Sequence, residues 1–593
     1  MRTSIISCCA LAVSVLLAPE RAHAQAYDRL APRQLPPAPT PIVSTPSGTQ
    51  APPLRPSNTV VIPVLKGLVF LPDIRALKPE GPTPGTTGIS HDGLPLLGRD
   101  DFTRSLSAYL GKPLTISDLN TISLDTSAFY KKNGHPFVYV IVPPQNVSAG
   151  IVQIVVTEYR LGALNITGNH WFSSALLRRD SGLVPGRTLS LAEVQDALDR
   201  LNDNPFRTVD SFFAPGAKQG TTDVTLQTRD RLPLHVYASY DNAGVPMMGR
   251  SEWAVGGTWG NVAGLGQILS YQFTHSVSDL YSGHAVNWST PLPWHDQIQV
   301  FGSYAWEHPN YRSNGISFNE AGHSGQASLR YIHTLPTVAI WPRTRLTHDI
   351  QAGYDFKTTN NTLEFGGAQV FASEAEVNQF PIIYNATMSD PYGQTTFRNQ
   401  LVFSPGGLTG ADRKHNVRTL VPGASDRYVY DTLTLTRTTW LPGGATWLLQ
   451  ATGQVSSTNL MYSNQIGLGG LYTARGYATD TSLGTEGISL TNEIRAPAFS
   501  LTHIVAPDAQ LYDTQQIGVF YDYGHVSQVH TIPQAINESD LSSIGLDLHS
   551  TVGRYASLTF NVGWRLHSLP PSRTLNGFGN KGAFGNIAIN VGY

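Results

Sequence analysis

Apolar and polar residues alternate one for one along many segments between residue 232 and the C-terminus. The period of two is clear at residues 269–274, 298–306, 447–455, 558–566 and 587–593. Successive side chains of a β-strand point to opposite faces, so each segment predicts a strand with one apolar and one hydrogen-bonding face. A soluble β-sandwich can alternate too, but its polar face would carry more lysine and glutamate. The pattern therefore favours a lipid-facing wall around a wet interior.

The length of this region predicts the size of a barrel. Residues 232–593 number 362 (593 − 231), and roughly 22 residues per strand and connection give about 16 strands, an even number that closes without an edge. The chain has 55 glycines, 25 tyrosines and 10 tryptophans but only 14% charged residues. This composition suits many strands and turns with aromatic girdles at the membrane interfaces. We expect a mainly β fold built on a transmembrane β-barrel.

Residues 60–230 follow another plan, strand-helix-helix-strand-strand, which occurs twice. The first copy predicts a strand at 60–70, where Pro63 indicates an edge, helices at 101–110 and 117–132, and a hairpin of strands at 137–142 and 151–159. A Pro/Gly-rich insertion follows its first strand, at 71–98. The second copy has strands at 162–167, 208–213 and 222–228, a helix at 173–180, and a helix opened by the capping box 190–193. We therefore expect two α+β domains, at 60–159 and 160–231.

The N-terminus is typical of an exported protein. Residues 1–24 have a basic start, a short apolar core and the cleavage site Ala22-His23-Ala24, which predicts a signal peptide. Residues 25–59 form a Pro-rich linker. Both cysteines, Cys8 and Cys9, lie in the signal peptide, so the mature chain should have no disulfide, thiolate metal site or cysteine nucleophile.

The sequence gives little support for nucleic-acid binding, dinucleotide binding or catalysis. The net charge of −2 argues against a nucleic-acid partner. Residues 577–582 spell G-x-G-x-x-G, but a short final strand follows them instead of the helix that a dinucleotide site needs. No H-E-x-x-H, G-x-S-x-G or P-loop motif occurs. We predict no enzyme activity, no cofactor and no catalytic or metal site.

Two short motifs form the candidate site. Arg475, Gly476 and Tyr477 lie in a glycine-flanked loop, and Asp522 lies in the alternating strand Phe520–Gly524. If the apolar face of that strand meets lipid, Asp522 points inward, where an ionised carboxylate needs a cationic partner. An arginine fork suits that role because it can hold a carboxylate with two hydrogen bonds. A second candidate is a lumen ion pair between Glu493 and Arg495, which are expected to face the lumen on the strand predicted at 488–494.

These motifs resemble a pair that marks the outer-membrane barrel transporters related to the barrel-assembly machinery, a V-R-G-[FY] loop and an [FG]-x-D-x-G strand. The second motif matches in full, and Ala474 stands at the valine of the first. The two α+β units resemble tandem POTRA domains. Together with a barrel of about 16 strands, the chain resembles the haemolysin/haemagglutinin secretion-activation family of two-partner secretion transporters.

The resemblance implies a mechanism and a set of residues. An unfolded exoprotein would be captured in the periplasm by the POTRA-like domains, pass through the barrel and fold outside the cell. The inward-folded loop around residues 469–486 would be held by a loop-barrel lock of Arg475, Gly476, Tyr477, Phe520, Asp522 and Gly524. Candidate substrate-binding residues of the second domain are Leu191, Val194, Leu198, Val224 and Leu226.

The same resemblance implies location and partners. We expect the outer membrane of a Gram-negative bacterium, with the POTRA-like domains in the periplasm. Partners would be a large exoprotein of adhesin, cytolysin or haem-binding type, membrane lipid and lipopolysaccharide, and periplasmic chaperones with the barrel-assembly machinery for insertion. Some members carry an N-terminal plug helix, which we do not expect here because only residues 25–30 precede the first proline region. A barrel-assembly insertase and a porin with solute-channel activity remain as alternatives.

Overall fold

The computed structural model describes residues 30–33, 57–82, 86–218, 220–308, 310–313, 316–341, 343–365, 368–505, 512–532, 536–568 and 582–593. The predicted signal peptide, most of the linker and most of the 577–582 motif lie outside these residues. The described chain forms two compact units, residues 57–232 and residues 233–593 with the segment 30–33. Among the described residues, no helix has the length and apolar character needed to cross a membrane.

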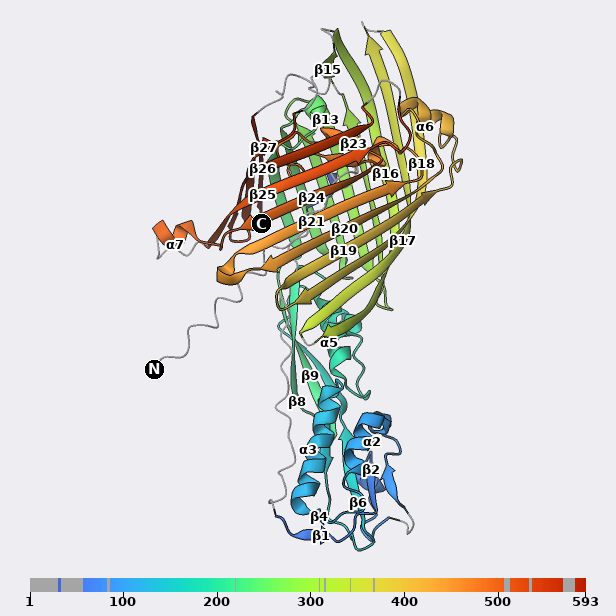
Figure 1. Ribbon diagram of the computed structural model, residues 1–593, viewed down its shortest axis with the longest axis vertical. Helices are drawn as coiled ribbons and strands as arrows, with labels where there is room; N and C mark the ends of the chain where they lie inside the picture. The colour runs from blue at the N-terminus through green and yellow to red at the C-terminus, as the bar shows by residue number, and fades with distance from the viewer. Residues whose placement is uncertain are drawn as a thin grey trace. The chain divides into compact units, whose positions relative to one another are not determined.

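The C-terminal unit is a closed antiparallel barrel whose strands follow chain order (Figure 1). Its strands are β10 (Leu234–Asp241), β11 (Glu252–Val262), β12 (Gln267–Ser276), β13 (Tyr281–Pro291), β14 (Gln297–Glu307), β15 (Asn310–Ser313), β16 (Ile316–Trp341), β17 (Thr344–Phe365), β18 (Ala368–Asp390), β19 (Gly393–Ser404), β20 (Tyr428–Trp440), β21 (Thr446–Ser456), β24 (Glu486–Arg495), β25 (Asp513–Ser527), β26 (Glu538–Val552), β27 (Ala556–Arg565) and β28 (Ala583–Gly592). The four-residue β15 pairs only with β16, while β14 pairs with β16 directly. The 17 strands of the sheet less β15 give 16 wall strands, which confirms the predicted number.

The last strand closes the barrel by pairing with the first. β10 and β28 are antiparallel, with Tyr237 opposite Gly592 and Asp241 opposite Ala588. Closure leaves every wall strand hydrogen-bonded on both sides, which a sheet in lipid requires because no water can satisfy a free edge. Small helices lie at the ends of the barrel: α6 (Lys414–Leu420), α7 (Leu501–Val505), η4 (Pro246–Met248) and η5 (Pro442–Gly444).

The two faces of the wall separate as the alternation predicts. Tyr271 and Trp306 on the outer face are 46% and 44% exposed, whereas Gln272 and Asn561 face inward and are buried. The outer face is therefore an apolar surface suited to lipid, and the inner face is a hydrogen-bonding surface.

The first α+β domain differs from its prediction at the start. The expected strand 60–70 divides into β1 (Val60–Ile62) and β2 (Gly67–Leu71), because Pro63 cannot continue a hydrogen-bonded ladder. The insertion 71–98 includes regular elements. It contains η2 (Ile74–Ala76), β3 (Gly88–Ser90) and η3 (Pro95–Gly98), and β3 pairs in parallel with β2. The remaining elements are α2 (Asp100–Ser107), β4 (Leu114–Thr115), α3 (Ile116–Lys132), β5 (Val138–Ile141) and β6 (Ile151–Glu158).

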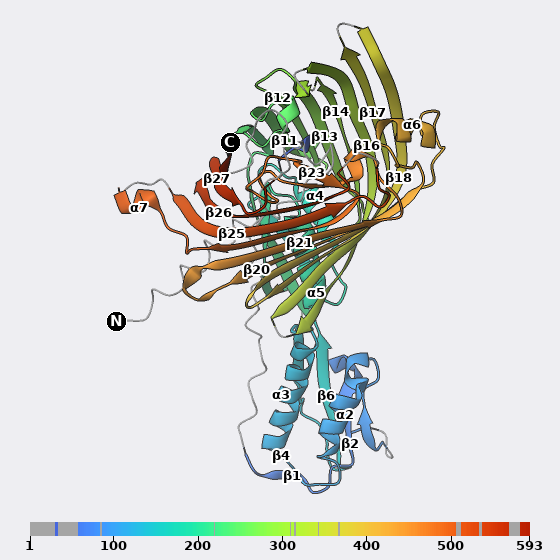
Figure 2. The same ribbon diagram turned by 45° about the horizontal axis from the view of Figure 1, so that its top comes forward.

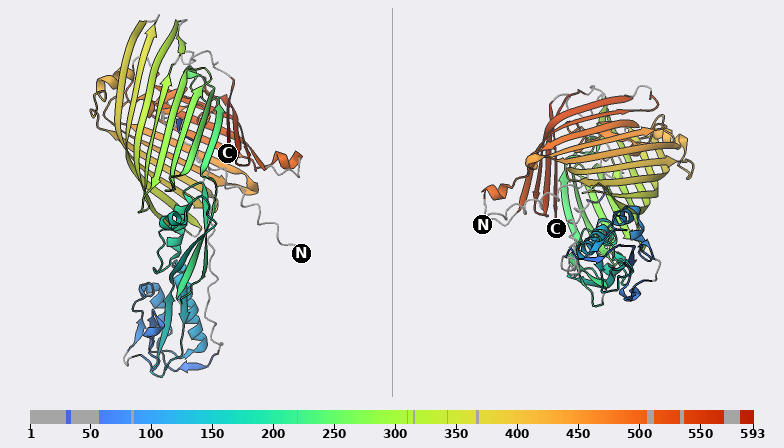
Figure 3. Two further views of the ribbon diagram at one scale, coloured as in Figure 1. Left: turned by 180° about the vertical axis from the view of Figure 1, so that it is seen from behind. Right: turned by 60° about the horizontal axis from the view of Figure 1, so that its bottom comes forward.

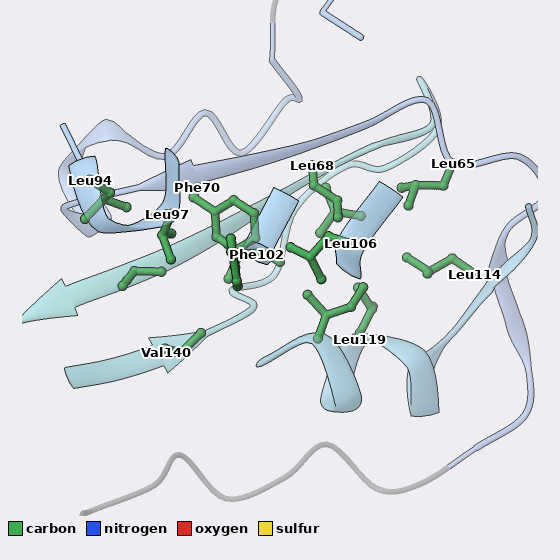
Figure 4. Packing of buried hydrophobic residues seen from close by; sticks show 14 of the residues in the cluster. Leu65, Leu68, Phe70, Leu94, Leu97, Phe102, Leu106, Leu114, Leu119 and Val140 are labelled. Carbon is green, nitrogen blue, oxygen red and sulfur yellow. The ribbon is translucent and has the colours of Figure 1, made fainter. Parts of the chain in front are cut away.

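The core of this domain lies between the sheet β3-β2-β6-β5 and the helices α2 and α3. Figure 4 shows Leu68 and Phe70 of β2 packed near Phe102 and Leu106 of α2. Tyr130, at the end of α3, is fully buried, and its hydroxyl donates a hydrogen bond of 2.8 Å to the Glu158 carboxylate. Burial and this acceptor raise the pKa of Tyr130, so it stays a neutral donor.

The second domain contains β7 (Arg160–Thr167), α4 (Ser174–Ser181), α5 (Leu191–Asn202), β8 (Arg207–Pro215) and β9 (Thr221–Asp230). The predicted capping box is present: the Ser190 hydroxyl accepts from the Glu193 backbone, and the Glu193 carboxylate accepts from the Ser190 backbone. The sheet order is β7-β9-β8, with β7 and β9 parallel.

The candidate substrate-binding residues of this domain need correction. Val194, Leu198, Val224 and Leu226 have no exposed surface, and Leu191 is half-buried. Their alternation marks the faces by which α5 and the sheet pack on each other, because the apolar stripe of a helix normally meets its own sheet. These four side chains hold the domain together and cannot touch a bound chain in this structure.

Candidate functional site

The connection between β21 and β24 folds back into the barrel as a hairpin. It contains η6 (Tyr462–Asn464), β22 (Ile466–Leu468) and β23 (Ser482–Gly484), and β22 pairs with β23. Figure 2 shows β23 within the ring of wall strands. Gly469 and Gly470 leave β22 with φ of 108° and 101°, a region that glycine adopts without steric cost. They turn the chain into a compact tip at residues 471–478, which is almost fully buried.

Arg475 at this tip contacts the wall at Asp522 of β25. Its backbone N–H and its Nε both donate to Asp522 Oδ2 at 2.9 Å, and its Nη2 donates to Oδ1 at 3.0 Å. The guanidinium carbon also lies 3.7 Å from the centre of the Phe520 ring, on the same face of β25. Asp522 is completely buried and Arg475 is 4% exposed. The fork geometry and the ring contact together fix the arginine in one orientation.

Glu493 of β24 is a second carboxylate on the same arginine. Arg475 Nη1 donates to Glu493 Oε2, and Arg495 Nε donates to Glu493 Oε1. The ion pair between Glu493 and Arg495 that the strand pattern suggested is thus present. Sequence reasoning missed that Glu493 also binds Arg475, because the parity of β24 places it on the inner face without showing which side chain it meets.

Within the described part of the chain, the group of residues best placed to hold a metal ion adjoins this cluster. Ligand atoms of Glu493, Asp547 and His549 lie within 4.8 Å of one another, and His549 Nε2 is 3.0 Å from Asp547 Oδ2. Both oxygens of Glu493 already accept from arginines. A cation there would displace two guanidinium groups from a buried carboxylate, so the cluster fits an ion-pair network better than a metal centre.

The residues after Arg475 attach the loop to β26 and β27. The Tyr477 hydroxyl lies within hydrogen-bond distance of the carbonyl oxygens of His567, at 2.6 Å, and Ser542, at 3.1 Å. Arg565 Nε donates to the Gly476 carbonyl at 2.7 Å, and its guanidinium carbon lies 5.2 Å from the centre of the Tyr477 ring. Sequence reasoning did not identify Arg565. Its position on the polar face of the β27 alternation was the only available signal.

Glycines in the wall make room for the loop. A Cβ on Gly563 would lie 2.7 Å from the Gly476 nitrogen and 2.8 Å from the Arg475 carbonyl group. A Cβ on Gly524 would lie 2.5 Å from Leu468 Cδ2. The backbone of the loop therefore rests directly on the backbone of β27, which only a residue without a side chain allows. Ala474, at the family's valine position, has φ of 44° and is buried.

A short N-terminal segment lies against another part of the inner wall. Leu30 is 2% exposed and packs with Tyr281, Ala285 and Ala305. Gln272 Nε2 donates to the Leu30 carbonyl at 3.2 Å. We expected no N-terminal plug, yet residues 30–33 contact the inner face of the barrel. The residues before 30 lie outside those described.

We expect Leu30→Asp to release this segment and widen the conducting path. A carboxylate at a buried apolar site loses its hydration without gaining a partner, so the segment should leave the wall. Single-channel conductance in planar bilayers should rise at least two-fold. Leu408→Asp is the control, because Leu408 is 53% exposed and should leave conductance unchanged. Equal conductance for Leu30→Asp and the parent chain would contradict the expectation.

Comparisons with known proteins agree with this architecture. The family model "Haemolysin secretion/activation protein ShlB/FhaC/HecB" matches residues 220–548, and the model "POTRA domain, ShlB-type" matches residues 86–158. The heme/hemopexin transporter protein HuxB of Haemophilus influenzae strain 86-028NP is 24% identical over 77% of this chain and 79% of its own length. The outer membrane transporter CdiB of Dickeya dadantii is 23% identical over 68% of this chain and 71% of its own length.

Solved structures share the fold. CdiB from Escherichia coli superposes with a TM-score of 0.71 at 18% identity, covering 93% of this chain and 92% of that chain. CdiB from Acinetobacter baumannii gives a TM-score of 0.64 at 17% identity and covers 95% of both chains. The family model spans 329 of the 593 residues (548 − 219), more than half of the chain. With its closed barrel of 16 strands and its POTRA domain, the chain therefore belongs to the haemolysin secretion/activation family ShlB/FhaC/HecB and is an outer-membrane pore for exoprotein secretion.

Proposed function

We propose that this pore secretes one large exoprotein, which its POTRA domains capture unfolded in the periplasm, and that the loop-barrel lock holds the loop in its working position during transport. The observation that carries the proposal is the seating of Arg475, which bridges Asp522 and Glu493 inside a closed wall. A solute porin needs neither such a loop nor tandem periplasmic domains. Folding of the emerged chain at the cell surface supplies the drive, because it removes that chain from the unfolded pool.

Relatives suggest the range of partners. HuxB is named as a heme/hemopexin transporter and another relative as a hemolysin transporter. We propose an exported partner of the haem-binding, cytolysin or adhesin type. The chain's own insertion would use outer-membrane lipid, lipopolysaccharide, periplasmic chaperones and the barrel-assembly machinery.

Deletion of the chain tests the proposal that it serves one exoprotein. We expect one large protein to disappear from the medium or cell surface, while the other outer-membrane proteins keep their abundance. Quantitative proteomics of the medium and the outer membrane measures both. A general fall in outer-membrane proteins would instead favour a barrel-assembly insertase.

The capture surface on the second POTRA domain lies along β8. In the described part of this domain, β8 is an edge of the sheet, since its only strand partner is β9. Asn202 already bonds both backbone groups of Val209 at 2.8 and 3.1 Å, so an added strand would pair beyond that residue. Phe212 follows and is 39% exposed. An extended polypeptide can add to such an edge by main-chain hydrogen bonds and set an apolar side chain beside Phe212.

We expect Phe212→Asp to reduce secretion of the exoprotein about ten-fold. A carboxylate removes the apolar contact and disfavours strand addition, while the domain core stays intact because Phe212 points outward. Immunoblots of the medium against the periplasm measure the effect. Leu124→Asp on α3 is the matched control, since Leu124 is 49% exposed in the other domain. If both variants secrete equally well, β8 is not the capture surface.

A further inference from the structure

The connection between β24 and β25 differs from the other turns at its end of the barrel. This is the end where β10 begins and β28 finishes, and it is the periplasmic end because β10 follows the POTRA domains. The other hairpins there join their strands with two to five residues, but residues 496–512 separate β24 from β25. This connection contains α7, and Figures 1 and 3 show α7 projecting outward beyond the wall strands.

Hydrogen bonds hold α7 in place. Phe499 and Gln515 exchange backbone hydrogen bonds of 2.7 and 3.0 Å, which pair the chain just before α7 with the first turn-side residues of β25. The Asp513 carboxylate accepts from the backbone N–H groups of Leu501 at 2.9 Å and Thr502 at 3.0 Å. The Ser500 hydroxyl also bonds Asp513. The helix is therefore fixed at both its start and its attachment to the wall.

This fixed helix exposes apolar side chains. Leu501, Ile504 and Val505 are 50%, 66% and 81% exposed, and the helix has no acidic residue, Lys or Arg. Three large aliphatic side chains exposed on a five-residue helix indicate that the helix contacts an apolar phase or a partner. The question is which partner covers them.

Aromatic side chains at the same end of the barrel indicate that the membrane covers them. The exposed Trp and Tyr residues in or beside the turns of this end include Trp294, Trp341, Tyr392, Trp440, Tyr512, Tyr555 and Tyr593. Trp and Tyr gather where a membrane protein meets the headgroup region, because their rings have an apolar body and a polar edge. The lipid-facing side of β25, the strand that holds α7, begins with Ile517 and Val519, which are 48% and 52% exposed.

We propose that α7 is an interfacial anchor whose Leu501, Ile504 and Val505 insert among the phospholipids of the periplasmic leaflet. A short apolar helix held beside an aromatic girdle lies at the headgroup and acyl boundary. The anchor would fix the depth and tilt of the barrel in the membrane at β24 and β25, the two strands that contain Glu493 and Asp522.

Depth-dependent quenching tests the proposal, because the predicted mature chain has no cysteine of its own. Val505→Cys, labelled with bimane, is reconstituted in phosphatidylethanolamine/phosphatidylglycerol vesicles that contain lipid brominated near the headgroup or near the chain end. We expect at least two-fold quenching by the shallow bromines and less by the deep ones. Val519→Cys, midway along β25, should show the reverse order, and Leu124→Cys in the POTRA domain should show no quenching.

Two results would overturn the proposal. One is a Val505→Cys signal that, like the Leu124→Cys signal, neither bromolipid quenches. The other is a bimane emission that shifts only when the protein-to-lipid ratio rises, which would assign the helix to a contact between two copies. Heat-modifiable migration of each labelled variant on gels checks that its barrel is folded, and the assay does not depend on secretion.

Discussion

Arg475→Ala should lower exoprotein secretion at least ten-fold while the barrel stays inserted in the outer membrane. The substitution leaves Asp522 and Glu493 buried beside each other without the guanidinium group that now bonds both. Removing one partner of a buried ion pair costs about 3–5 kcal/mol, because the remaining charge is uncompensated. This cost destabilises the state in which the loop is bound to the wall, so the loop should detach from the wall. Immunoblots of the medium measure secretion, and heat-modifiable migration measures barrel folding.

Two further variants separate the lock from a general loss of stability. Arg475→Lys keeps the charge but lacks the fork that reaches two carboxylates, so it should restore secretion only in part. Arg330→Ala is the matched control, because Arg330 pairs with Asp355 at 2.6 Å on β16 and β17 and both side chains are buried. It should lower barrel stability without a comparable loss of secretion. If Arg330→Ala and Arg475→Ala impair secretion equally, the lock has no special role.

Gly563→Ala should displace the same loop without removing any charge. The added Cβ would meet loop backbone at 2.7–2.8 Å, closer than such atoms approach, so either the loop or β27 must move. Inserting one methyl group into a tight contact costs about 1–3 kcal/mol, and we expect a secretion loss of about ten-fold. Trypsin should then cleave after Arg475, which is buried when the loop is seated.

Gly585→Ala on the neighbouring strand β28 is the control for this substitution. A Cβ there would find its nearest neighbour, the Asn561 carbonyl oxygen, at 3.7 Å, which is ordinary van der Waals contact. It should secrete normally and resist trypsin at Arg475. Protection of Arg475 in Gly563→Ala would show that the wall yields instead of the loop.

Local rules in the sequence determined much of this protein. The period of two follows from the pleat of a strand, so the alternation predicted the outer and inner faces of the barrel and the inward position of Asp522. The length of the alternating region predicted about 16 strands. The Ser190–Glu193 capping box likewise predicted the start of α5. Pro63 indicated an edge strand, but the sequence did not show that the strand would divide there.

Contacts between distant residues were decided by the tertiary structure. Strand register and the path of the loop determine which inner-face side chains meet. The local sequence pattern predicts neither of them. For that reason Glu493 and Arg565 emerged as partners of the loop only in the folded barrel, as did the seat of Leu30 on the inner wall. The same limit explains the error at Val194 and Leu226. An apolar stripe looks alike whether it will bind another chain or its own sheet, and only packing distinguishes them.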